Sequence, residues 1–209
     1  MTDLDDRVLD AALAVLAESG MSGLTLSRMA EEMGASRMTL HRNGISRQGI
    51  VERLSLLAVE EYRRAVWPAL TAAGSGSERL ELALRATCDV ADRWRHLLTG
   101  LFAEDGGVFH EPGLAADRPE AEMALATRAV FIEPLARLLR DGAKDGSLAA
   151  FDDPDLMATV LFNQVGWTFL ALRVGQRWPA DASTNSVVGL AMRGVSASRD
   201  FGAEDEQSA

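Results

Sequence analysis

Cationic and hydroxyl side chains gather in one short stretch of this 209-residue chain, between residues 22 and 50. The stretch holds four arginines and two glutamates, a net charge of +2 (4 minus 2), although the whole chain carries −10. Affinity for DNA comes largely from cations that meet phosphates, and arginine presents a planar fork of donors to phosphate or guanine. The stretch therefore predicts a locally basic, DNA-binding tip on an acidic body. Because Lys144 is the only lysine, the preference for arginine also fits a genomic coding bias.

The elements that would position these side chains are two short helices joined by a glycine turn. Thr25 is suited to cap the first helix, which Gly34 ends, and Ser36 is suited to open the second over residues 37–42. Ala30 supplies the small residue that a close helix crossing needs, and Gly34 supplies the turn, as in a helix-turn-helix. Apolar contacts of Met29, Met33, Ala35 and Leu40 would lock the pair. This arrangement leaves the other face of the second helix free to enter a major groove.

The remaining sequence predicts an all-α protein, because apolar residues recur at helical spacing and no run of β-branched residues alternates. We expect a helix that ends at Gly20, and a helix capped by Ser46 that runs toward Trp67. After a linker-like stretch at residues 74–77, we expect a helix whose apolar stripe reaches Leu98, then a short helix and loops over 103–118. Further helices are predicted over about 119–144, kinked at Pro134, over 154–174, and over 182–198. We expect three regions: a helix-turn-helix domain at 1–50, a helical ligand-binding and dimerisation domain at 51–199, and a disordered acidic tail at 200–209.

Residues 7–54, RVLDAALAVLAESGMSGLTLSRMAEEMGASRMTLHRNGISRQGIVERL, resemble the N-terminal domain of the TetR family of transcriptional regulators. The resemblance covers about a quarter of the chain in detail. It implies that Thr25 caps its helix and touches phosphate, that Ser36 and Arg37 open a recognition helix, and that Arg47 clamps a phosphate. Thr39 and His41 would meet the DNA backbone or the bases. The residues predicted to contact DNA are Thr25, Arg28, Ser36, Arg37, Met38, Thr39, His41, Arg42 and Arg47.

Two positions depart from the family pattern. His41 stands where the family usually has tyrosine, and it keeps a group that can donate to phosphate. Gly44 stands where the family usually has a phenylalanine that packs against the bundle, so the joint between the third and fourth helices would be looser. Whether Ile45 fills that place stays open at the level of sequence.

Other chemistries have little support in the sequence. Cys88 is the only cysteine, and its spacing from His96 and His110 matches no zinc pattern, so we expect no metal site and no cofactor. No Ser/His/Asp arrangement, glycine-rich phosphate loop or Glu-x-x-His pair appears, which leaves a helical enzyme as a remote alternative. The sequence has no apolar run of about 18 residues and no signal peptide, and these features predict a cytoplasmic protein without a membrane span.

The second domain is predicted to bind a small apolar molecule, because its large apolar residues exceed what a two-layer core needs. Each aromatic or Met residue has a plainer interpretation as core, and the polar residues Asn163 and Gln164 need partners that are a ligand, each other or a second subunit. The candidate ligand contacts are Trp67, Thr87, Trp94, His96, Phe102, Met123, Phe131, Phe162, Asn163, Gln164 and Trp167.

The helix over 154–174 is apolar all round, which predicts burial on every side against the core and a second subunit. We expect a homodimer formed by the last two helices, with the stripe Thr184, Val187, Val188, Ala191 and Val195 at its interface. Such a dimer would place two recognition helices on a near-palindromic operator in double-stranded DNA. Binding of the ligand would release the dimer from the operator, and the protein would then act as a ligand-controlled repressor. Activation remains an alternative to repression. The rival hypothesis is a DNA-bound structural or division-control protein that acts through a protein partner.

Overall fold

The computed structural model describes residues 3–105 and 128–197, without the side chains of Asp3 and of residues 102–105. The regular structure in these ranges is helical, and a single bridge between Leu148 and Ser196 is the one extended pairing there. The all-α prediction is therefore confirmed. The chain divides into two compact units. The N-terminal unit comprises Met1–Arg64 with Asp89–Ala124, and the C-terminal unit comprises Ala65–Cys88 with Leu125–Ala209.

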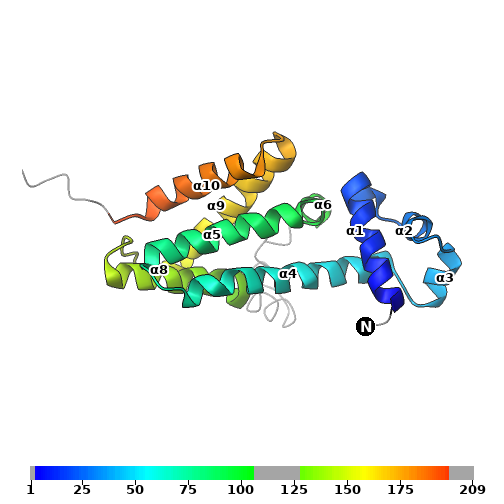
Figure 1. Cartoon of the computed structure of the whole chain (residues 1–209), viewed down its shortest axis with the longest axis horizontal. Coiled ribbons are helices and arrows are strands. Elements are labelled where there is room, and N and C mark those ends of the chain that lie inside the picture. Colours follow the sequence, from blue (N-terminus) through cyan, green and yellow to red (C-terminus); the bar gives the residue numbers. More distant parts are fainter. Residues whose placement is uncertain (1–2, 106–127, 198–209) are drawn as a thin grey trace, which may run out of the picture. The chain divides into compact units, whose positions relative to one another are not determined.

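In the N-terminal unit, α1 (Asp3–Gly23) packs against α2 (Leu26–Glu32) and α6 (Arg95–Asp105), and α2 packs against α3 (Arg37–Arg42) (Figure 1). The long helix α4 (Arg47–Thr71) starts in this unit. The helix α1 breaks at Gly20, whose φ of 65° and ψ of −169° are not helical, and then resumes for a few residues. The helix expected to end at Gly20 is therefore interrupted there but ends at Gly23, and the positive φ of Gly20 favours glycine.

Side-chain caps fix where these helices begin. The Thr25 hydroxyl accepts a hydrogen bond from the N–H of Arg28 at 3.2 Å, and the Ser36 hydroxyl accepts one from the N–H of Thr39 at 3.1 Å. The Ser46 hydroxyl does the same for the N–H of Gly49 at 3.0 Å. All three predicted caps are therefore confirmed, and each satisfies an N–H that has no partner inside its helix.

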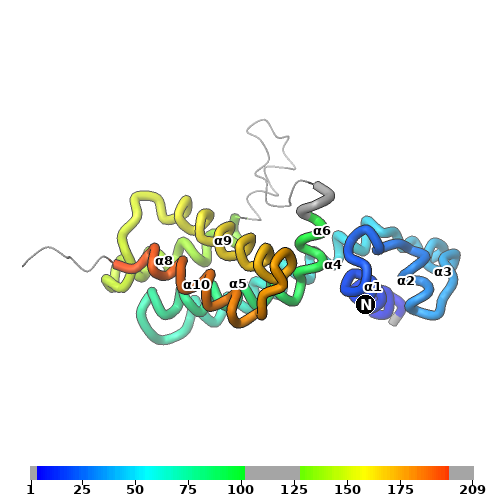
Figure 2. The backbone as a smooth tube through the Cα atoms, turned by 90° about the horizontal axis from the view of Figure 1, so that it is seen from above, coloured from blue at the N-terminus to red at the C-terminus, as the bar shows by residue number. Residues whose placement is uncertain are grey.

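The C-terminal unit is built from the end of α4, most of α5 (Gly76–Arg93), α8 (Glu133–Asp145), α9 (Pro154–Leu170) and α10 (Ala180–Val195). The helix α9 contacts both α8 and α10, which the tube of Figure 2 traces in yellow to red. Short π-helical turns, Arg128–Ile132 and Ala171–Gly175, precede α8 and follow α9. The fully buried Leu135, Leu138 and Phe169 mark its core.

Two predicted helices have different bounds in the structure. The stripe expected to continue to Leu98 is divided between α5 and α6, which break at Trp94. Of the helix expected over 119–144, the described part is the π-helical turn Arg128–Ile132 followed directly by α8, with Pro134 in the first turn of α8. Helical turns therefore lie on both sides of Pro134, and the kink expected there stays a prediction. Residues 119–127 and the predicted acidic tail at 200–209 lie outside the described residues.

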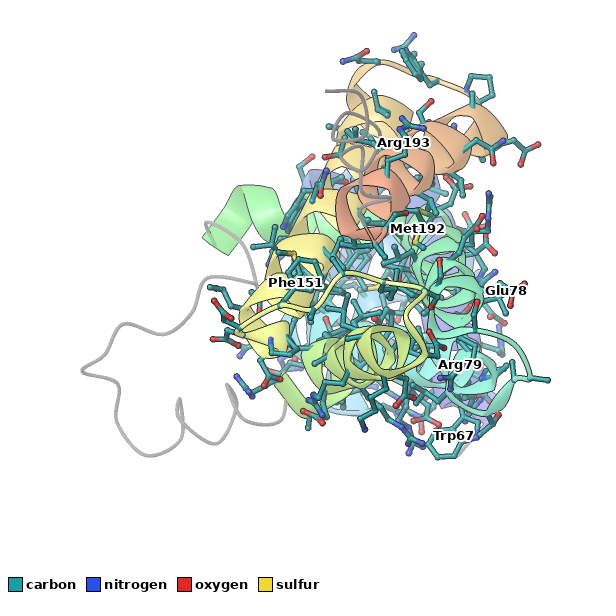
Figure 3. The ribbon with its side chains drawn as sticks, turned by 90° about the vertical axis from the view of Figure 1, so that its left-hand side faces the viewer. Trp67, Glu78, Arg79, Phe151, Met192 and Arg193 are labelled. Carbon is teal, nitrogen blue, oxygen red and sulfur yellow. The ribbon has the colours of Figure 1, made fainter. Side chains whose placement is uncertain are left out.

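Glycines allow α5 and α8 to touch through their backbones. A Cβ atom added to Gly76 would overlap the Cα and N atoms of Gly142. Around this crossing, the N–H of Gly76 donates to Asp145 at 2.6 Å, and Arg79 pairs with Asp141 at 2.9 Å. Figure 3 shows Arg79 on α5 beside α8. Hydrogen bonds to Asp145 lower the pKa of its carboxyl, first that from the side chain of Ser147 and then those from the N–H groups of Gly76 and Ser147, so the charged form is favoured at neutral pH.

Candidate nucleic-acid interface and ligand residues

The pair α2 and α3 has the geometry of a helix-turn-helix. Gly34 in the turn has a φ of 64°, and the N–H of Ala35 donates to the carbonyl of Ala30 at 2.8 Å. Met29 and Leu40 are fully buried, and Ala30 almost so. Of the four residues predicted to lock the pair, Met29 and Leu40 are buried whereas Met33 and Ala35 are half-buried, so α3 is held by one buried side chain while its other positions face outward.

The exposed face of α3 carries donors and no carboxylate. Arg37, Met38, Thr39, His41 and Arg42 are all exposed, and the helix sequence RMTLHR contains no acidic residue. The hydroxyls of Ser36 and Thr39 lie 2.9 Å apart at the start of the helix. A helix face of this kind can donate to phosphates and to base edges in a groove.

Arg28 is exposed, but its guanidinium already has partners. It pairs with the carboxylate of Glu18 at 2.5 Å and donates to the hydroxyl of Ser19 at 3.3 Å. Both side chains of the ion pair are well exposed, so the pair contributes little to stability. A phosphate would have to compete with Glu18 for Arg28.

The structure places Arg47 against backbone carbonyls. Its Nε donates to the carbonyl of Leu24 at 3.0 Å, and a terminal nitrogen donates to that of Met21 at 3.2 Å. Arg7 similarly donates to the carbonyl of Met33 at 3.1 Å, where α2 ends. Sequence reasoning missed both roles, although the open carbonyls at a helix end are a general signal for a nearby arginine. Contact of Arg47 with a phosphate stays a prediction.

The candidate ligand contacts are divided between the two units. Trp94 and His96 belong to the N-terminal unit, and the Nε1 of Trp94 donates to Glu61 at 2.7 Å. Arg93 donates to the same carboxylate. Burial and then the charge of Arg95 lower the pKa of His96, so its imidazole is neutral at pH 7.

The other described candidates belong to the C-terminal unit. The rings of Phe131 and Phe162 lie 5.0 Å apart at 38°. The hydroxyl of Thr87 donates to the carbonyl of Ala83 and the amide of Asn163 donates to that of Thr159, each at 2.9 Å and each within its own helix. Gln164 and Trp167 are half-buried.

Trp67 is 60% exposed and points away from the bundle in Figure 3. Met123 and the side chain of Phe102 lie outside the described residues. Ligand contact by any of these candidates stays a prediction.

Most residues of the α10 stripe expected at the dimer interface do not lie on the surface of the chain. Val187, Val188, Ala191 and Val195 are buried within the chain, and so is Phe169 on α9. The exposed apolar residues of this region are instead Leu156 and Val160 on α9 and Leu190 on α10. Leu156 and Val160 of α9 are 62% and 49% exposed in the single chain, so burial of α9 on every side would need the second subunit and stays a prediction.

In residues 3–105 and 128–197, no three His, Cys, Asp or Glu side chains gather in a way that would hold a metal ion. No helix there has both the length and the hydropathy of a membrane span.

No family model matches this sequence, and no curated protein matches it either. Solved structures do match in fold. A transcriptional regulator of the TetR/AcrR family from Thermobifida fusca aligns with a TM-score of 0.69 and 18% identity, over 92% of this chain and 98% of that one. The TetR family regulator PfmR from Thermus thermophilus aligns with a TM-score of 0.66 and 20% identity, over 90% and 97%. The regulator FadR from Bacillus subtilis, in complex with stearoyl-CoA, aligns with a TM-score of 0.65 and 16% identity, over 90% and 97%.

Proposed function

We propose that this protein, which has the fold of TetR-family regulators, is a DNA-binding transcriptional regulator that works in the cytoplasm. The observation that carries the proposal is α3: a helix locked by buried Leu40 whose exposed face offers Arg37, Thr39 and Arg42 without a carboxylate. The acidic remainder of the chain argues against binding along its whole surface, since phosphates are repelled there. DNA binding therefore belongs to this small basic face.

The regulator acts as a homodimer in this proposal. Leu156 and Val160, four residues apart on α9, and Leu190 on α10 are exposed apolar side chains that a second copy would cover. Two copies related by a two-fold axis present two recognition helices to successive major grooves, which requires a near-palindromic operator.

A small apolar ligand controls the regulator in this proposal. The support is the paired rings of Phe131 and Phe162 and the fold shared with a regulator that holds stearoyl-CoA. A ligand that prefers the DNA-free conformation releases the operator in proportion to that preference. Repression relieved by the ligand is the expected outcome, in keeping with the family that the sequence resembles.

Recovery of genomic DNA on the purified protein tests the proposal. Sequencing of the retained fragments should yield one or a few promoter regions that share a near-palindrome. Many dispersed sites would instead support the rival hypothesis of a DNA-bound structural protein that acts through a protein partner. Retention of no DNA above a bead control would contradict both.

A further inference from the structure

A hollow of about 220 Å³ opens in the N-terminal unit, beside the turn that joins α3 to α4. Val8 and Leu9 of α1 and Ile50 of α4 line it and are nearly buried, and half-buried Ile45 adds to the lining from the turn. The lining comes from three separate parts of one unit, without the C-terminal helices, and its surface is about equally apolar and polar.

Gly44 lines the hollow without a side chain. Its φ of 71° is a conformation that side chains rarely adopt, and a Cβ atom added there would meet nothing within 4 Å. The turn geometry thus favours glycine at this position, and the space where its side chain would begin is open.

Polar side chains also line the hollow, and of these Asp5 and Arg53 are half-buried, like Ile45, whereas Asn43 is exposed. Asp5 and Arg53 line it and face each other, with 3.5 Å between Oδ2 and the guanidinium nitrogen. Asn43 also lines it and is held by a 2.7 Å hydrogen bond from its amide to the carbonyl of Thr39. Because the two charges are opposite and close together, a charged guest would be attracted by one and repelled by the other. A neutral guest with one hydrogen-bonding group suits this lining better.

The volume limits the guest to a small molecule. An apolar cavity of about 150 Å³ holds benzene, whereas drug-sized ligands occupy sites of roughly 300–1,000 Å³. We propose that the hollow is a second binding site of this protein, for a neutral aromatic molecule of one or two rings that carries an N–H or O–H group. The rings pack on the apolar lining, and the polar group meets the pair of Asp5 and Arg53.

The site adjoins the recognition helix directly. Asn43 is the C-terminal cap of α3, and the N–H of Ile45 donates to the carbonyl of Leu40 at 3.1 Å. A guest that contacts these residues is coupled to α3, so the guest and DNA change each other's affinity by the same factor. This coupling rests on the proposed function, whereas binding of the guest to the free protein does not.

Methyl NMR of the full chain with indole as the probe tests the proposal. The chain has three isoleucines, of which Ile45 and Ile50 line the hollow and Ile132 lies in the C-terminal unit. Indole should shift the δ1-methyl signals of Ile45 and Ile50 in a saturable way and leave that of Ile132 unchanged. A shift of Ile132 alone, equal shifts of all three signals, or no shift at solubility-limited indole would overturn it.

A pair of matched variants confirms the location. Gly34 also has a positive φ, 64°, with nothing within 4 Å of an added Cβ, but it does not line the hollow. Gly44→Phe should weaken indole binding by about tenfold or more, equivalent to roughly 1.4 kcal/mol, while Gly34→Phe carries similar backbone strain and should leave it unchanged. Equal affinities of the two variants would overturn the assignment. Circular dichroism checks that both are folded, and if either is not, the methyl signals of the wild-type chain decide.

Discussion

Arginine side chains in the N-terminal unit divide into those already engaged by the protein and those that face outward. Arg47 and Arg7 donate to backbone carbonyls at helix ends, and Arg28 pairs with Glu18. Arg37 and Arg42 are exposed on α3. Charge counting along the sequence treats these residues alike, so their different roles follow only from the positions of nearby carbonyls and carboxylates.

Arg47 is expected to stabilise the fold as well as any DNA complex. Arg47→Met keeps the apolar stem but removes two charge-assisted hydrogen bonds to carbonyls of nearly buried residues, so the free energy of unfolding should fall by about 1.5–3 kcal/mol. Denaturant unfolding measures this. Gln48→Ala, a neighbouring change that removes one exposed hydrogen bond to Glu52, is the control and should cost at most about 0.5 kcal/mol. Equal losses for both variants would mean that Arg47 has no structural role.

Glu18 is expected to compete with DNA for Arg28. Glu18→Gln frees the guanidinium and should raise DNA affinity about two- to fivefold at low salt, the range that an exposed ion pair allows. Asp10→Asn, on the same helix, changes the net charge equally and serves as the control in a fluorescence anisotropy titration. The gain should also vanish in an Arg28→Ala background. If Asp10→Asn raises the affinity as much, only net charge is at work.

At the scale of elements, the helices that a cap or a glycine delimits were predictable from sequence. Thr25, Ser36 and Ser46 act locally, and their hydrogen bonds reach only three residues along the chain. The break between α5 and α6 at Trp94 carries no such local signal, because an unbroken apolar stripe spans it. The contact of Gly76 with Gly142 was equally hidden, since it joins residues far apart in sequence.

The crossing of α5 and α8 should be intolerant of a single methyl group. Gly76→Ala would place a Cβ against backbone atoms of Gly142, which cannot rotate away, so the free energy of unfolding should fall by about 1–3 kcal/mol. Gly166→Ala on α9 is the control, because no atom of the chain lies within 4 Å of a Cβ added there. Alanine also favours the helix over glycine by about 1 kcal/mol. A Gly76→Ala protein as stable as wild type would refute close backbone packing at this crossing.

At the scale of the whole molecule, the proposed function requires a dimer. The sequence pattern pointed to the wrong stripe of α10, because an apolar helical stripe has the same appearance whether its own chain or a partner covers it. Burial in the structure assigns Val188 and Ala191 to the chain's own core. The apolar residues left exposed on α9 and α10 then become the candidates for the interface.

Leu156→Glu combined with Val160→Glu should convert the dimer to a monomer in multi-angle light scattering, because four carboxylates would meet at a two-fold interface. Leu82→Glu is the matched control, since Leu82 is also exposed and apolar but lies on α5. The control should remain dimeric. A wild-type chain that is monomeric at micromolar concentration, or a double variant that stays dimeric, would contradict the assigned face.

The central claim is that α3 reads DNA, and it is tested most directly by the affinity of α3 variants for a fragment recovered from the genome. Arg37→Ala combined with Thr39→Ala should lower the preference for that fragment over random DNA by at least about tenfold, since each base contact contributes about 1–3 kcal/mol of discrimination. Arg137→Ala, an exposed arginine on α8, removes one positive charge elsewhere and should leave the preference intact. Circular dichroism should be unchanged in both proteins. Wild-type preference in the α3 variant at physiological salt would contradict the account.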